Sequence, residues 1–90
     1  MVTVYVIESL KDGTWYTGMA LNVEARLKEH NAGKNKFTKG HRPWKIIYTE
    51  QHPSWAEARL KEKYFKSNAG KIALQKKLQD HAGRTGSLPA

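Results

Sequence analysis

The sequence predicts an α+β domain whose elements follow the order β-β-α-β-α-α. Two observations carry this prediction. The β-branched segment Val2 to Ile7 and the segment Thr14 to Met19 flank the turn pair Asp12–Gly13, an arrangement typical of a β-hairpin. Stretches with helical spacing and capping residues then lie on both sides of a third apolar segment, Trp44 to Thr49. We therefore expect strands packed against helices in one domain, residues 1–82, followed by a flexible tail at 83–90.

The first helix is expected between Asn22 and Gly33. Asn22 is a typical N-cap residue, Glu24 lies in the first turn where carboxylates are favoured, and Gly33 suits the position just past a helix end. Val23 and Leu27 define the buried edge of this helix. Arg26 and His30 are four residues apart beside that edge, so we expect both at the border between core and surface.

Two more helices are expected after the third strand. Ser54 and Glu57 form a capping box at the start of the first of these, which gives Glu57 a structural role. An apolar stripe follows on the helical wheel, and Glu62 falls within it. Its members are Trp55, Ala58, Phe65 and Ala69. The last helix is expected from Lys71 to His81, with Leu74 and Leu78 facing inward.

Composition restricts the classes of function. The chain has 90 residues, no cysteine and a formal charge of +8, with a sequence pI near 9.9. A disulfide framework and a thiolate metal site are therefore excluded, and the basic excess favours a polyanionic partner, above all nucleic acid. Without an apolar run of membrane-spanning length or a signal-peptide pattern, we expect a protein of the cytoplasm with no membrane partner.

Several polar residues suggest a site. An even hairpin loop puts Tyr5 and Tyr16 on the same face of the sheet, where they either form part of a site or pack against a helix. Glu62 on its apolar stripe either pairs with Lys66 or Arg59 or holds a metal ion. The segment 34–43 is expected as a loop that suits contacts with a nucleic-acid backbone. Its cations are Lys34, Lys36, Lys39 and Arg42.

Taken together, these residues resemble the GIY-YIG endonuclease superfamily. Thr3-Val4-Tyr5 stands where the family has Gly-Ile-Tyr, and Tyr16-Thr17-Gly18 stands where it has Tyr-Ile-Gly. The helix text Arg26-Leu27-Lys28-Glu29-His30-Asn31-Ala32-Gly33 is similar to that of small stand-alone members, which are themselves similar to the N-terminal nuclease domain of the excision-repair protein UvrC. The resemblance covers about Val2 to Asn68. It implies a small three-stranded antiparallel β-sheet flanked by helices.

The function implied by this resemblance is metal-dependent hydrolysis of phosphodiester bonds in nucleic acid, DNA more than RNA, in repair or processing. Glu62 would be the protein ligand of one Mg²⁺ or Mn²⁺, and Arg26 would clamp the scissile phosphate. Tyr5 is the family's candidate general base, with Tyr16 positioning water or phosphate. His30 is a second candidate for the base, and the sequence does not decide between Tyr5 and His30.

The alternative function is a nucleic-acid-binding module that keeps the same scaffold with little or no turnover. All five catalytic-type residues occur together, which favours the endonuclease. We expect a monomer that contacts nucleic acid through the cations of residues 34–43. Protein partners and the preferred strand structure are not indicated by the sequence.

Overall fold

The hairpin predicted around Asp12–Gly13 forms the first two strands, β1 (Val2–Ser9) and β2 (Trp15–Ala20). Gly13 takes a left-handed conformation with φ of +79°, and the Ser9 hydroxyl accepts hydrogen bonds from the backbone N–H groups of Lys11 and Asp12. The third strand, β3 (Trp44–His52), pairs antiparallel with the other side of β1. The sheet order is therefore β2-β1-β3, which confirms the expected three-stranded antiparallel sheet.

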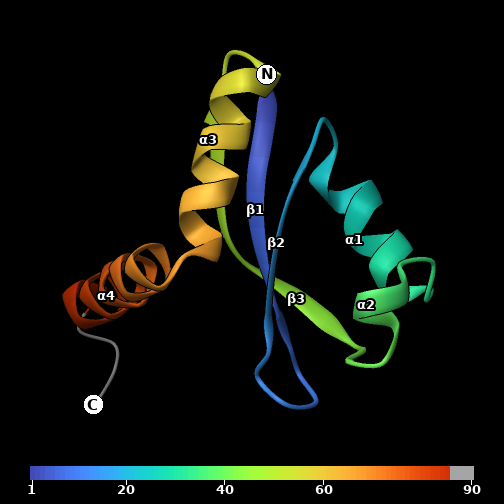
Figure 1. The fold of residues 1–90 in the computed structure, drawn as a ribbon. Helices are drawn as coiled ribbons and strands as arrows, with labels where there is room; N and C mark the ends of the chain where they lie inside the picture. The colour runs from blue at the N-terminus through green and yellow to red at the C-terminus, as the bar shows by residue number, and fades with distance from the viewer. Residues whose placement is uncertain (86–90) are drawn as a thin grey trace.

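Helices cover both faces of this sheet (Figure 1). This computed structural model describes residues 1–85, and side-chain surroundings as far as residue 79. The helices α1 (Val23–Asn31) and α2 (Lys36–Lys39) lie on one side, and α3 (Trp55–Lys66) and α4 (Asn68–Thr85) lie on the other. No helix within these described residues has the length and apolar character needed to cross a membrane.

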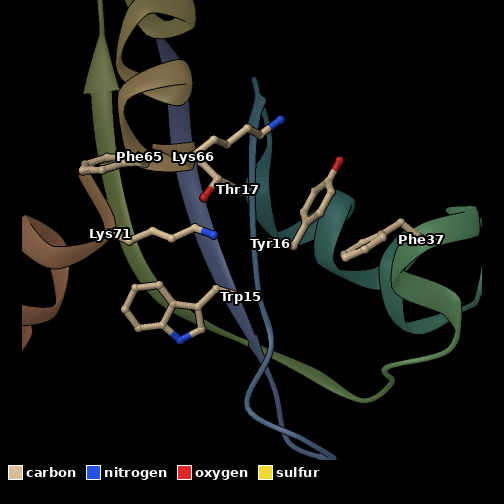
Figure 2. Close-up of a pocket in the computed structure, with 7 residues that line it drawn as sticks. All are labelled: Trp15, Tyr16, Thr17, Phe37, Phe65, Lys66 and Lys71. Carbon is tan, nitrogen blue, oxygen red and sulfur yellow. The ribbon is translucent and has the colours of Figure 1, made fainter. Parts of the chain in front are cut away.

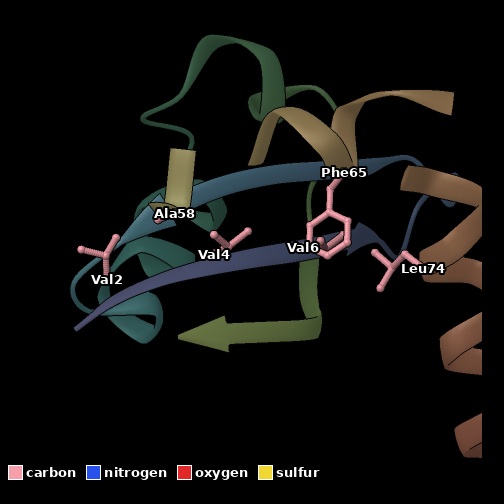
Figure 3. Close-up of a cluster of buried hydrophobic side chains, with 6 residues drawn as sticks. All are labelled: Val2, Val4, Val6, Ala58, Phe65 and Leu74. Carbon is pink, nitrogen blue, oxygen red and sulfur yellow. The ribbon is translucent and has the colours of Figure 1, made fainter. Parts of the chain in front are cut away.

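The central strand β1 is buried on both faces because each face carries a helical layer. Val2, Val4 and Val6 point to the α3 and α4 side, where they meet Ala58, Phe65 and Leu74 (Figure 3). Tyr5 and Ile7 point to the α1 and α2 side, where they join Ala20 and Trp44. A strand buried on both faces explains the nearly continuous apolar run at the N-terminus.

The caps of α1 and α3 follow the prediction. The Asn22 side chain accepts from the backbone N–H of Ala25, Gly33 has a φ of +82°, and the Ser54 side chain accepts from Glu57 N–H. The expected loop at 34–43 instead contains α2, because the Asn35 side chain accepts from the N–H groups of both Phe37 and Thr38 and so caps a short helix.

Other expectations needed correction. The apolar stripe predicted on α3 is shorter than expected: Ala58 and Phe65 are buried, whereas Trp55 is 52% exposed and Ala69 is exposed. Trp55 is the first residue of α3, a helix that starts at the end of the sheet beside the N-terminus (Figure 1), and Ala69 belongs to the next helix. Some bounds also differ from those expected: β3 continues to His52, and α4 begins at Asn68. This last helix runs through Thr85 into the expected tail, whose remainder at 86–90 lies outside the described residues.

Leu74 fixes α4 to the sheet, and its removal should measure that contact. Leu74 is 1% exposed, as predicted, and Leu78 packs beside the same cluster. Leu74→Ala should lower the free energy of unfolding by about 2–5 kcal/mol in urea denaturation, because it leaves a cavity. Ile72→Ala is the matched control, because Ile72 lies on the same helix and is 61% exposed. It should change the free energy by less than about 0.5 kcal/mol. Equal midpoints for the two variants would contradict this packing.

Candidate active site

Tyr5 and Tyr16 share one face of the sheet, as the hairpin parity predicts. The register pairs Tyr5 with Gly18 and Ile7 with Tyr16, so both tyrosines point toward α1. Tyr5 is 1% exposed, whereas Tyr16 is half-buried. The two phenols therefore differ in environment: one is enclosed and the other reaches the surface.

Gly18 makes room for the Tyr5 phenol. A Cβ atom at residue 18 would lie 2.6 Å from the Tyr5 hydroxyl oxygen and 2.7 Å from the ring carbon that carries it. The hydroxyl thus rests against the backbone of β2, and any side chain there would displace it. Gly18 is needed for this close approach rather than for a special backbone conformation, since its φ is not positive.

His30 joins Tyr5 to α2 through a buried chain of hydrogen bonds. The Tyr5 hydroxyl lies 2.9 Å from His30 Nε2, and His30 Nδ1 lies 2.8 Å from the Thr38 hydroxyl. When Nδ1–H donates to Thr38, Nε2 is left to accept from Tyr5, and the Thr38 hydroxyl can donate to the Asn35 carbonyl at 3.5 Å. We expected His30 at the border of the core, but it is 1% exposed because α2 packs over it.

The residues around this chain hold it in place. The Trp44 indole N–H donates to the Thr38 carbonyl at 2.8 Å. The Asn31 amide forms a pair of hydrogen bonds with the Trp44 backbone, at 2.7 Å and 3.2 Å. Thr38 and Asn31 were not among the residues predicted for the site. Thr38 lies eight positions from His30, so only the packing of α2 reveals their contact.

Burial favours the uncharged forms of both Tyr5 and His30. Desolvation is the main reason that the pKa of Tyr5 lies well above its usual value, and Tyr16 raises it further. Desolvation likewise lowers the pKa of His30, with the Arg26 charge acting in the same direction. Arg26 opposes the shift at Tyr5, and the Glu62 carboxylate adds to it. Charges from α1 and α3 therefore both act on the Tyr5 phenol.

Arg26 stands at the open side of this pair. Its side chain is 47% exposed, and its Nε lies 3.1 Å from Glu29 Oε1. Ion pairs of this spacing on an exposed helix contribute only about 0.3–0.5 kcal/mol. The guanidinium can therefore exchange Glu29 for an incoming anion at little cost.

Glu62 approaches the site from the opposite layer. Its side chain is 16% exposed, and its Oε2 lies 3.2 Å from Lys66 Nζ, so one of the two ion pairs considered from the sequence is present. Lys66 Nζ also lies 5.9 Å from the centre of the Tyr16 ring. Because β2 is an edge strand, side chains from α3 meet Tyr16 around that edge.

The donor set fits a weakly held Mg²⁺ or Mn²⁺. Among the described residues, no group of three His, Cys, Asp or Glu side chains could form a metal cage. Glu62 supplies one carboxylate, which suits an ion that keeps most of its waters and shares substrate phosphate oxygens. The i,i+4 pair with Lys66 is no obstacle, since such pairs contribute about 0.3–0.5 kcal/mol.

A basic rim borders the site. We use this name for Lys34, Lys36, Lys39 and Arg42, all of which are exposed. Lys36 and Lys39 lie on α2 on either side of Thr38, and the Arg42 guanidinium packs against Gly33 while its Nε donates to the Lys39 carbonyl. Phe37 projects from the same helix and is 54% exposed.

Comparison with known proteins identifies the family of this domain. A family model described as the GIY-YIG catalytic domain matches residues 1–79. A UPF0213 protein of Streptococcus sanguinis is 42% identical over 72 residues, which cover 79% of this chain and 82% of the relative. A UPF0213 protein of Halobacterium salinarum is 46% identical over 74 residues, covering 79% and 95%.

A solved structure supports the fold as well. The solution NMR structure of the UPF0213 protein BH0048 from Bacillus halodurans has a TM-score of 0.52 and 39% identity, over 84% of each chain. Fold and family match thus define a small nuclease-type domain, with one tyrosine on the central strand and one on the edge strand. The chain belongs to the GIY-YIG catalytic domain family, which confirms the resemblance found in the sequence.

Gly18→Ala should disturb the site directly, because the new methyl group collides with the Tyr5 hydroxyl. We expect the free energy of unfolding to fall by about 1–3 kcal/mol and the ring resonances of His30 to shift in NMR spectra. Gly40→Ala is the matched control, since a Cβ there meets no atom within 4 Å. It should change stability by less than about 1 kcal/mol and leave His30 unchanged. Unshifted His30 resonances in Gly18→Ala would contradict the close approach.

Proposed function

We propose that this chain is a divalent-metal-dependent endonuclease that hydrolyses a phosphodiester bond in DNA, in repair or processing. The observation that supports this function most is the set of groups gathered around the Tyr5 phenol. Tyr5 is hydrogen-bonded to His30 and packs against Gly18. The charges of Arg26 and Glu62 both act on the pKa of its phenol. A neutral acid–base pair, a cation and a carboxylate at one place are what phosphodiester hydrolysis requires.

Arg26 binds the scissile phosphate in this mechanism. Its guanidinium fork can donate two hydrogen bonds to two phosphate oxygens once it leaves Glu29. The half-buried Tyr16 hydroxyl borders the same space and orients the attacking water or the phosphate. Binding at this point brings a negative charge close to His30 and Tyr5.

Tyr5 and His30 together take the proton of the attacking water. A free tyrosinate is costly, because burial raises the pKa of Tyr5. A concerted transfer of two protons avoids the tyrosinate. An O–H bond of water breaks as a new O–H bond forms at Tyr5 Oη. At the same time, the original Tyr5 proton crosses the 2.9 Å hydrogen bond to His30 Nε2. The neutral imidazole accepts it, and the bound phosphate offsets the new charge. Tyr5 and His30 thus share the role of general base.

Glu62 would hold the divalent ion, which would supply charge stabilisation at the phosphate and the leaving oxygen. Lys66 would then release Glu62 Oε2 and remain a cation beside Tyr16. The basic rim guides the nucleic-acid backbone across α2 toward Arg26. A monomer with one such site would cut one strand.

Glu62→Gln should test the activity. Cleavage of labelled single-stranded, duplex, flap and junction DNA with Mg²⁺ or Mn²⁺ should fall by at least about 100-fold, while DNA affinity in EDTA stays within about twofold. Glu57→Gln is the control, because Glu57 lies on the same helix in the capping turn. Full activity in Glu62→Gln would remove Glu62 from the site. DNA binding without cleavage by the parent protein would favour the nucleic-acid-binding module instead.

The double variant Lys36→Ala with Lys39→Ala should test the basic rim. The slope of log affinity against log salt should become shallower by about two phosphate contacts, because both exposed cations flank Thr38 on α2. Lys28→Ala with Lys76→Ala is the control, since these exposed lysines lie on α1 and α4, outside the rim. An unchanged slope in the rim variant would show that α2 does not face the backbone.

A further inference from the structure

We propose that a surface pocket along the edge of β2 binds one unpaired base of the nucleic acid, next to the phosphate that is cut. The pocket has a volume of about 220 Å³ and includes Tyr16, Phe37, Lys66 and Lys71 (Figure 2). The inference rests on the proposed function and adds a class of substrate: DNA with an unpaired nucleotide at the cleavage position.

Phe37 is the main stacking surface of the pocket. A phenylalanine that is 54% exposed gains little by packing, yet its ring is held between Tyr16 and His41, at centroid distances of 5.8 Å and 5.4 Å. The Asn35 cap fixes the short helix that presents it. A rigid, exposed aromatic ring of this kind suits stacking with a base, because every base has a π-face.

The opposite wall of the pocket is also fixed. Trp15 lies on the α4 side of β2, across the strand from Tyr16 and Phe37 (Figure 2), and its indole N–H donates to Glu8 Oε2 at 3.1 Å. The pocket runs around this edge of β2, and its volume is smaller than the roughly 300–1,000 Å³ that larger ligands occupy, so it suits one planar base. Because β2 is an edge strand, backbone groups on its outer side are free of sheet pairing and can contact the edge of a base.

The charges at the pocket favour a nucleic acid over an apolar partner. Lys66 and Lys71 line it from α3 and α4, and Lys36 precedes Phe37 on α2. Cations beside aromatic rings are the usual combination for binding unpaired nucleotides. Tyr16 and Lys66 belong both to this pocket and to the candidate active site, so a base held here lies beside the phosphate at Arg26. A base within a duplex is stacked on its neighbours and cannot enter.

The test compares two DNA probes in EDTA, where cleavage does not interfere. One is a duplex with a single unpaired 2-aminopurine, and the other is the same duplex with that base paired. The parent protein should bind the unpaired probe more tightly and change its fluorescence, because stacking alters 2-aminopurine emission. Phe37→Ala should weaken binding of the unpaired probe by about tenfold and leave the paired probe within about twofold.

Two further variants make the result specific. Phe37→Tyr should restore affinity for the unpaired probe, because it keeps the ring. Trp55→Ala should change neither probe, because Trp55 is a similarly exposed aromatic residue, 52% exposed, on another part of the molecule. Melting temperatures of all variants should match the parent, since the substituted side chains are exposed.

Equal affinity of Phe37→Ala and parent for the unpaired probe would contradict base binding in the pocket. It would leave the proposed endonuclease function standing, since cleavage is tested separately with Glu62→Gln. If the parent self-associates and Phe37→Ala abolishes this without changing DNA affinity, the pocket is a protein contact, and the base-binding proposal is equally overturned. Failure of the parent to bind either probe would contradict the proposed function itself.

Discussion

The hydrogen bond between the Tyr5 hydroxyl and His30 is the interaction on which the arrangement of the site depends. Both groups are almost completely buried, and a buried polar group without a partner costs about 1–3 kcal/mol. The bond therefore fixes α1 over the central strand, and the second bond from His30 to Thr38 fixes α2 over α1. Within the part of the chain whose side chains are described, every buried side-chain nitrogen and oxygen has a hydrogen-bond partner. The same contacts that complete the core thus also hold the Tyr5–His30 pair that the proposed mechanism uses.

The edge position of β2 explains how two separate helical layers contribute to one site. Residues on opposite faces of a sheet are normally kept apart by the strands between them. At an edge strand that separation ends, so the α3 side chains Glu62 and Lys66 approach the face that carries Tyr16. Gly18 adds to this, because the missing side chain lets the Tyr5 hydroxyl lie against the strand. Side chains from the two faces could not meet around a central strand, because its neighbours on both sides separate them.

The charged groups of the site are held by weak partners, which suits binding of a substrate. Arg26 pairs with Glu29, and Glu62 pairs with Lys66, each within one turn of a helix. Such pairs stabilise the free chain by only a few tenths of a kcal/mol, roughly, so a phosphate or a hydrated cation can replace them. The formal charge of +8 makes the approach of a polyanion favourable before any of these contacts form. Binding energy can then serve to order the reacting groups.

The sequence by itself determined the elements and much of the site, because turns, caps and strand alternation are local. Asp12–Gly13, Asn22 and Ser54 predict where elements begin, and hairpin parity alone places Tyr5 and Tyr16 on one face. Tertiary structure decided the rest, since it depends on contacts between residues far apart in the chain. It buried His30 under Thr38, exposed Trp55 at the end of the sheet, and brought Phe37 and Lys71 to the same pocket. Helical periodicity describes one helix at a time, so it could not show which neighbour covers each face.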